Sequence, residues 1–380
     1  MTVSSIKRHR LSAASVTIVA ALFLTACGGD DTEGEAPGAM GNATPAPLSA
    51  EAGEPAGEVA EFSANITSAV RTGDRFLSRD GDTLYSGTAA EPDMNSTDIA
   101  PECGELSGYR NTVVLPCPDG IHVLAPNGNT TAVVGQAHSY TSAVGLPDGR
   151  IAGHRAESNV IDVYGPDGEQ SSDFQVSNHG SQLIAVPGDE DLLLEVNSPE
   201  TSITEVELGE ERSGSSLRVG LGVGKVAAGT NGLIAAADTI GNQLMIYTAT
   251  DVIRLHQSFP VDESPWAVTV DSERDLVWIT STATGTLTGW DVSSGTGIKV
   301  AELPVVEAPH SLTRDGSGGF VVFSGEGHGV QAISNDDIEA AIEDGQEAAD
   351  AERELLAPFD PVDRLPSGRD GSQQSTAESN

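Results

Sequence analysis

Basic residues are scarce in this chain of 380 residues, which has 19 lysines and arginines against 57 aspartates and glutamates. The formal net charge is −38 at pH 7, and only three lysines occur: Lys7, Lys225 and Lys299. A chain with this charge repels nucleic-acid phosphates and anionic lipid headgroups. We therefore expect no nucleic-acid partner and no docking on membranes through charge.

Motifs for catalysis are missing as well. The sequence has no Gly-x-Ser-x-Gly nucleophile turn, no His-Glu-x-x-His metal motif and no phosphate-binding loop. Ser213, which precedes Gly-Ser-Ser, is not placed like a nucleophile and is typical of a connector. The sequence assigns no catalytic residue and requires no cofactor.

Long apolar runs are also missing, and the stretch from residue 11 to 26 is too short for a comfortable membrane span. This stretch follows Lys7, Arg8 and Arg10 and contains no acidic residue. A basic start, a short apolar region and small residues at its end are typical of a secretory signal.

The end of this stretch, Leu24-Thr25-Ala26-Cys27, resembles the lipobox of bacterial lipoproteins. The resemblance implies that residues 1–26 are cleaved off and that Cys27 carries diacylglycerol, with acyl chains such as palmitate. The membrane would then be a partner through the lipid, on the extracytoplasmic face of the cell membrane. A plain signal peptide with an accidental cysteine is the alternative. Cleavage leaves 16 basic against 57 acidic residues, a net charge of −41.

Cysteine is rare, with three in the chain. Once Cys27 is assigned to lipid, Cys103 and Cys117 remain, and in an exported protein such a pair is expected to form a disulfide. Closing a loop of this size contributes about 3 kcal/mol to stability. A metal site is the alternative, but two thiols fourteen residues apart with His122 nearby make a poor zinc motif.

The composition changes along the chain and divides it into segments. Residues 27–57 are rich in Ala, Pro, Gly and Glu and predict a disordered acidic tether. Residues 58–334 alternate short β-branched runs with turns. Residues 335–356 favour a surface helix, capped by Asn335 or Asp336, with a thin apolar stripe around Ile338 and Ile342. Residues 357–380 predict a disordered tail.

A repeat organises residues 58–334. When its copies are aligned on the turn before the second strand, these turn residues are spaced 42, 41, 43 and 44 apart: Gly149, Asp191, Gly232, Asp275 and Gly319. A period in the low forties with three to four short strands per copy is typical of a propeller blade. Weaker copies at 111–134 and 60–90 bring the number to seven. The class is therefore all-β, a seven-bladed β-propeller.

The last copy ends at Ser334 without an outer strand. We expect the segment near Glu58–Ile66 to supply that strand and to close the ring, because an open edge would otherwise remain exposed.

Five segments of the repeats carry a resemblance to known proteins: 231–239, 267–271, 275–280, 289–292 and 327–333. Through them the repeats resemble the seven-bladed propellers of the YncE-like class, and residues 220–334 are similar to actinobacterial LppL-type lipoproteins. The resemblance implies the propeller fold and the lipid-anchored location. It implies no particular activity, and it does not include the Cys103 and Cys117 pair.

Four side chains fall at or just before the starts of inner strands: His138, His179, Trp266 and His310. Since inner strands begin at one mouth of the central channel, we expect these four side chains to lie on one face of the ring. Neutral imidazoles there would suit zinc or copper. The alternative is that they only plug the channel. His154 and His328 are expected to be solvated, and His122 to lie on a third strand.

Three functions follow as hypotheses, and the fold alone does not choose among them. The first is a lipid-anchored cell-envelope protein whose propeller is a non-catalytic binding or scaffold module, with an envelope protein or a small ligand as partner. The second is a metal or small-ligand carrier that uses the central funnel. The third is an envelope hydrolase or a quinoprotein-like oxidoreductase, which the missing motifs disfavour.

Overall fold

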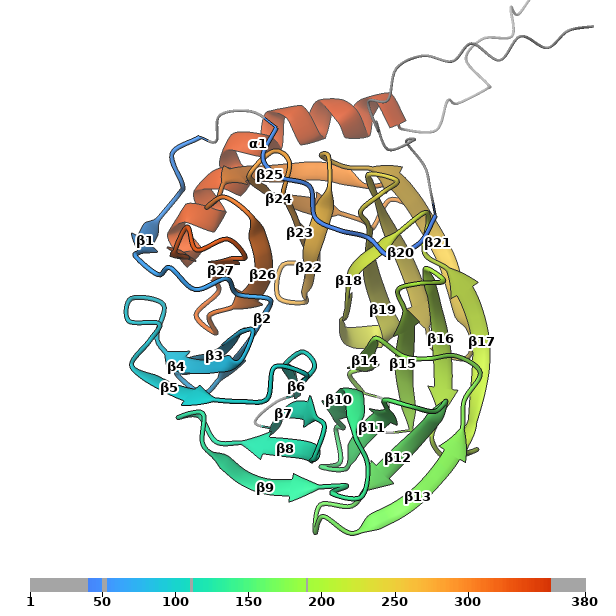
Figure 1. Cartoon of the computed structure of the whole chain (residues 1–380). Helices are drawn as coiled ribbons and strands as arrows, with labels where there is room; N and C mark the ends of the chain where they lie inside the picture. Colours follow the sequence, from blue (N-terminus) through green and yellow to red (C-terminus); the bar gives the residue numbers. More distant parts are fainter. Residues whose placement is uncertain (1–39, 50–52, 110–111, 189–190, 357–380) are drawn as a thin grey trace, which may run out of the picture. The chain divides into compact units, whose positions relative to one another are not determined.

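The computed structural model describes residues 40–49, 53–109, 112–188 and 191–356. The predicted signal peptide, Cys27 and the predicted tail from residue 357 lie outside the described residues. Seven antiparallel four-stranded sheets are arranged around a central channel (Figure 1). The seven-bladed propeller predicted from the repeat is therefore confirmed.

The first six blades each use four strands that follow one another from the channel outward. Blade 1 comprises β2 (Ser68–Thr72), β3 (Arg75–Asp80), β4 (Thr83–Gly87) and β5 (Asn95–Asp98). Blade 2 comprises β6 (Ser107–Tyr109), β7 (Thr112–Cys117), β8 (Gly120–Leu124) and β9 (Thr130–Val134). Blade 3 comprises β10 (Tyr140–Gly145), β11 (Ile151–Arg155), β12 (Val160–Tyr164) and β13 (Gln170–Gln175).

The second half of the ring repeats this order. Blade 4 comprises β14 (Gln182–Ala185), β15 (Leu192–Asn197), β16 (Ser202–Glu207) and β17 (Arg212–Arg218). Blade 5 comprises β18 (Val223–Ala228), β19 (Leu233–Asp238), β20 (Gln243–Ala249) and β21 (Ile253–Pro260), with a short 3₁₀ turn, η1 (Thr230–Gly232), after β18. Blade 6 comprises β22 (Pro265–Asp271), β23 (Leu276–Ser281), β24 (Thr286–Asp291) and β25 (Ile298–Pro304).

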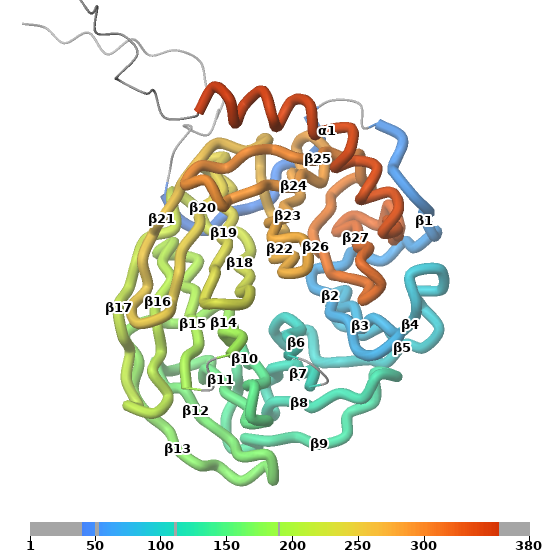
Figure 2. Tube along the Cα trace, turned by 180° about the vertical axis from the view of Figure 1, so that it is seen from behind, coloured from blue at the N-terminus to red at the C-terminus, as the bar shows by residue number. Residues whose placement is uncertain are grey.

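Blade 7 is assembled from both ends of the propeller segment. It comprises β26 (Pro309–Arg314), β27 (Phe320–Ser324), β28 (Val330–Ile333) and, as its outer strand, β1 (Glu58–Ala60). Strand β1 pairs antiparallel with β28, and Glu58 lies opposite Ala332. The predicted closure by the segment near Glu58–Ile66 is confirmed, and Figure 2 shows β1 beside the last blade from behind.

At three of the five turn positions that aligned the copies, the backbone conformation explains the residue type. Gly149, Gly232 and Asp275 have φ values of 92°, 69° and 56°. This left-handed region is open to Gly and accessible to Asp and Asn, so the turn between first and second strand selects these residue types.

The core lies between the blades. Among the described residues, buried apolar side chains form seven clusters, and each one joins two neighbouring blades. In the cluster between blades 4 and 5, for example, Leu194 and Ile203 pack with Met245 and Tyr247. The second strand β15 is buried at every position, whereas the outer strand β5 is exposed at every position. Closing the ring buries both faces of each sheet.

Small polar side chains near the channel connect neighbouring blades. The backbone N–H of Leu106 donates to Ser68 Oγ over 3.0 Å, and that of Ala69 donates to Ser311 Oγ over 3.0 Å. Thr280 Oγ1 donates to the Pro309 carbonyl over 2.9 Å. These hydrogen bonds satisfy backbone groups that no strand partner reaches.

Helix α1 (Asn335–Leu356) has the predicted bounds and packs along β25. Its cap differs from the prediction, because Ser334 caps the helix in place of Asn335 or Asp336. Asp337 N–H donates to Ser334 Oγ over 3.2 Å, and Ser334 N–H donates to Asp337 Oδ2 over 3.1 Å. This reciprocal arrangement satisfies two backbone donors at once. Ile338 is buried in the cluster between blades 6 and 7.

The segment that precedes β1 differs from the predicted tether. We name the described residues 40–49 and 53–57 the N-terminal strap. Gly41 N–H donates to the Leu221 carbonyl, Ser49 N–H to Ala283 and Ala56 N–H to Pro304, over 3.0, 2.9 and 3.0 Å. The strap buries few side chains, but its backbone N–H groups find acceptors before β18, between β23 and β24, and at the end of β25 (Figure 1). The composition of this segment did not predict these hydrogen bonds, because composition indicates how many apolar side chains can be buried and not which backbone groups are paired.

Candidate binding site in the central funnel

A cavity of about 310 Å³ occupies the central channel. Every blade contributes to its wall through the residues at the start of its inner strand, among them Ser68, Glu105, Ser142, Gln182, Lys225, Ala267 and His310. Because all inner strands run in the same direction, these starting residues gather at one end of the channel, which we call the funnel mouth.

An ion pair spans the funnel mouth. Lys225, at the start of blade 5, donates from Nζ to Glu105 Oε1, at the start of blade 2. These blades lie on opposite sides of the ring, and the two residues are 120 positions apart in sequence. The side chain of Lys225 is 19% exposed and that of Glu105 is 41% exposed. Arg79 is buried nearby, and its charge interacts favourably with Glu105.

Two aromatic rings flank this ion pair. The Lys225 ammonium lies 5.7 Å from the centre of the Trp266 ring, within the range of a cation–π contact. The Trp266 and His310 rings have centroids 6.0 Å apart and are tilted by 48°. A cation and an anion therefore lie beside two flat rings, the indole of Trp266 and the imidazole of His310.

His310 is available for hydrogen bonding. Burial lowers its pKa, and the nearby Lys225 charge acts in the same direction, while Glu326 opposes them. The ring is consequently neutral at pH 7, with one donor and one acceptor nitrogen. In the part of the chain that the structure describes, neither nitrogen has a hydrogen-bond partner. The ring lies directly against Gly325, where a Cβ would come within 1.7 Å of Nδ1.

His179 is not among the residues that line this cavity. Its ring packs edge-on against His154, with centroids 4.9 Å apart. His154 was expected to be solvated, which is wrong: its exposed fraction is 0%. It lies between blades 3 and 4, where Nε2 faces the Asn178 carbonyl at 3.1 Å and Glu195 Oε1 at 4.0 Å. Sequence spacing placed it on a second strand but did not show the neighbouring blade that covers it.

Glu195 is the one acidic residue among those described whose two carboxylate oxygens are both buried without a hydrogen-bond partner. It is 1% exposed. Burial raises the pKa of Glu195 to about 8. It does not line the central cavity, so we assign it to the interface of blades 3 and 4.

His138 lies outside the funnel, in a separate surface hollow with Arg155 and Glu157. Of the four side chains that sequence placed at the mouth, only His310 lines the cavity, and the Trp266 ring lies beside it. Sequence reasoning missed Glu105 and Lys225. The rarity of lysine was a signal for Lys225, but no sequence signal joins it to Glu105.

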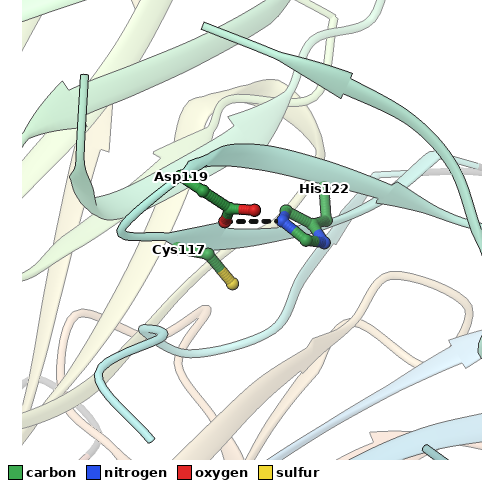
Figure 3. Close-up of side chains that lie close together, drawn as sticks. All are labelled: Cys117, Asp119 and His122. Atoms are coloured by element: carbon green, nitrogen blue, oxygen red, sulfur yellow. Dashed lines mark hydrogen bonds and ion pairs between the residues drawn. The ribbon is translucent and has the colours of Figure 1, made fainter. Parts of the chain in front are cut away.

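One group of three potential metal ligands occurs among the described residues: Cys117, Asp119 and His122 (Figure 3). The Cys117 sulfur is bonded to Cys103, which confirms the predicted disulfide and leaves no thiolate for a metal. His122 lies on the third strand of its blade, as predicted, and its Nε2 is 2.8 Å from Asp119 Oδ1. The group is a disulfide beside a surface hydrogen bond.

No family model matches this chain, and no curated protein sequence is similar to it. Solved structures are similar in fold. The β-propeller domain of Myceliophteria thermophila Cps50 (Swd1) has a TM-score of 0.58 at 12% identity and covers 73% of this chain and 98% of its own. Kuenenia stuttgartiensis hydrazine synthase has a TM-score of 0.58 at 11% identity, covering 73% and 97%. A streptogramin B lyase has a TM-score of 0.55 at 12% identity, covering 73% and 96%.

At these identities the likeness shows the propeller fold alone. The YncE-like and LppL-type assignment is supported for its fold and otherwise stays a prediction. Among the described residues no helix is long and apolar enough to cross a membrane.

Proposed function

We propose that this chain is an extracytoplasmic lipoprotein, anchored through acyl chains on Cys27, whose propeller binds a small ligand in the central funnel without chemical turnover. The ion pair between Lys225 and Glu105, beside Trp266 and His310, carries the proposal. A concave site with a few convergent polar groups and flat apolar walls is typical of small-ligand binding.

We do not propose a metal as the ligand. Zinc sites in proteins use three or four protein ligands. Among the described residues that line the cavity, His310 is the one imidazole, and no group of three potential ligands lies at the funnel mouth.

A thermal-shift screen tests the function. The purified mature protein is heated with a library of anions, cations, zwitterions and neutral compounds of a few hundred daltons. A ligand that binds the folded state raises the melting temperature. We expect hits with the wild type that are lost in His310→Ala and kept in His328→Ala, a matched exposed histidine of the same blade. A library without hits, or hits that persist in His310→Ala, would contradict the proposal.

A further inference from the structure

Building on the proposed function, we infer that the funnel ligand is a small zwitterion of the amino-acid class. Such a ligand carries an ammonium and a carboxylate a few bonds apart and an apolar, preferably flat, side chain. Its carboxylate would pair with Lys225 and its ammonium with Glu105, so that it inserts between two ions that now pair with each other.

The existing pair disfavours ligands with a single charge. An anion bound to Lys225 would take from Glu105 its ion-pair partner and leave it the charge of Arg79, and a cation bound to Glu105 would leave Lys225 without its partner. Lys225 is four-fifths buried, with its side chain 19% exposed, so losing its partner there is costly. A zwitterion keeps one opposite charge beside each of the two ions.

The charge of the whole chain supports the same class. At −41 after cleavage of residues 1–26, the mature protein repels anions on approach. It attracts cations, but a bound cation at Glu105 would lie next to the Lys225 ammonium and be repelled by it. A neutral zwitterion encounters neither penalty.

The walls and the volume set the remaining properties. His310 lines the cavity and Trp266 does not, although its ring lies 6.0 Å from that of His310. The His310 ring favours a flat side chain on the ligand and adds a free donor or acceptor. The cavity of about 310 Å³ lies at the lower end of the roughly 300–1,000 Å³ of ligand pockets. The ligand is therefore the size of an amino acid.

Isothermal titration calorimetry on the mature protein tests the class with three matched probes. These are L-phenylalanine, its amide, which is a cation, and its N-acetyl derivative, which is an anion. We expect the zwitterion to bind at least tenfold more tightly than either analogue. Equal or tighter binding of a singly charged analogue, or no binding by any of the three, overturns the inference.

Variants locate the binding. Lys225→Met and Glu105→Gln are each expected to weaken L-phenylalanine binding at least tenfold, whereas Lys225→Arg keeps the charge and retains the preference for the zwitterion. Lys299→Met and Glu302→Gln are the matched controls, because they break a lysine–glutamate pair on β25, outside the funnel. Unchanged L-phenylalanine binding in Lys225→Met overturns the inference. Loss of the preference for the zwitterion in Lys225→Arg also overturns it, so the test remains valid if Lys225→Met does not fold.

The two proposals fail differently. If singly charged compounds bind in the funnel and zwitterions do not, the ligand class is wrong and the small-ligand function stands. If no compound of any class binds, both are wrong.

Discussion

The side chain of Gln331 and the main chain of Ala56 are joined by a 2.6 Å hydrogen bond across 275 positions of sequence. Gln331 Nε2 donates to the Ala56 carbonyl, and Gln331 Oε1 accepts from the Val306 N–H over 2.9 Å. The side chain is fully buried. One glutamine thus holds the incoming N-terminal chain against the last blade.

Gln331→Leu is expected to lower the free energy of unfolding by about 2–4 kcal/mol, since each buried group left without a partner costs about 1–3 kcal/mol. Urea unfolding measures the change. Gln346→Leu, on the exposed face of α1, is the matched control and should change stability little. Deleting residues 58–68 should cost more than Gln331→Leu, because it also removes β1 and the buried Ile66. Equal stability of the two glutamine variants would contradict this account.

Deletion of residues 40–49 is expected to lower the melting temperature by less than the deletion of residues 58–68. Those strap residues contribute hydrogen bonds from Gly41, Ala46 and Ser49, and each is worth about 1 kcal/mol net. Differential scanning calorimetry compares the two proteins. A deletion that leaves the melting temperature at the wild-type value would show that the strap does not stabilise the propeller.

Stability should depend on pH through Glu195. Its folded-state pKa of about 8 exceeds the ordinary value of 4.5. Between these values the folded state holds a proton that the unfolded state has released, so the stabilisation is complete below pH 4.5, declines as pH rises and is lost above about 8. The slope is at most about 1.4 kcal/mol per pH unit.

Glu195→Gln should flatten the dependence of stability on pH and leave the protein more stable than the wild type at pH 8. Glu200→Gln, at an exposed position on the same blade, is the control and should leave the pH dependence unchanged. Chemical unfolding at pH 5, 6.5 and 8 measures it. A wild type that is equally stable at all three pH values, with Glu195→Gln behaving identically, refutes the assignment.

The disulfide predicts the behaviour of the thiols. Denatured mature protein should show no labelled Cys103 or Cys117 without reductant and both labelled after reduction. Cys103→Ser should cost about 3 kcal/mol of stability. Zinc added to the oxidised protein should give no bound ion by native mass spectrometry, because Cys117 has no free thiolate. A zinc adduct lost in His122→Ala would argue for a metal site.

Lipidation at Cys27 remains a prediction from sequence. Cys27→Ser should leave the precursor unprocessed or release the protein from membranes, as read by fractionation and intact mass. Cys103→Ser serves as the control for loss of a cysteine as such and should fractionate like the wild type. Membrane attachment and mass shift that persist in Cys27→Ser would exclude the lipid anchor.

Sequence spacing predicted the blades because the signals for them are local. A turn at Gly149, Gly232 or Asp275 needs a left-handed backbone, and that requirement selects Gly or Asp in three of the five aligned copies. The missing outer strand of blade 7 was visible in the same way, since the repeat ends at Ser334 while an unassigned strand precedes blade 1. The disulfide followed from two cysteines being left in an exported chain.

The residues that line the funnel could not be predicted from the sequence in the way that the blades could. Several inner strands start with a register shift, between Tyr140 and Ser142, Val223 and Val226, Pro265 and Val268, and Pro309 and Ser311. Because a shift of one residue turns side chains to the other face of a strand, these bulges decide which residues point into the channel. His138, His179 and Trp266 lie near the starts of inner strands, yet none of them lines the cavity.

The amino-acid sequence by itself determined the propeller, the closing strand, the helix and the disulfide, because each rests on short-range turn chemistry, periodicity or residue count. Only the tertiary structure decided that Lys225 meets Glu105, that His154 is buried and that the N-terminal strap lies on blades 5, 6 and 7. These contacts join residues far apart in sequence, and they exist only once the ring has closed and fixed the position of each blade relative to the others.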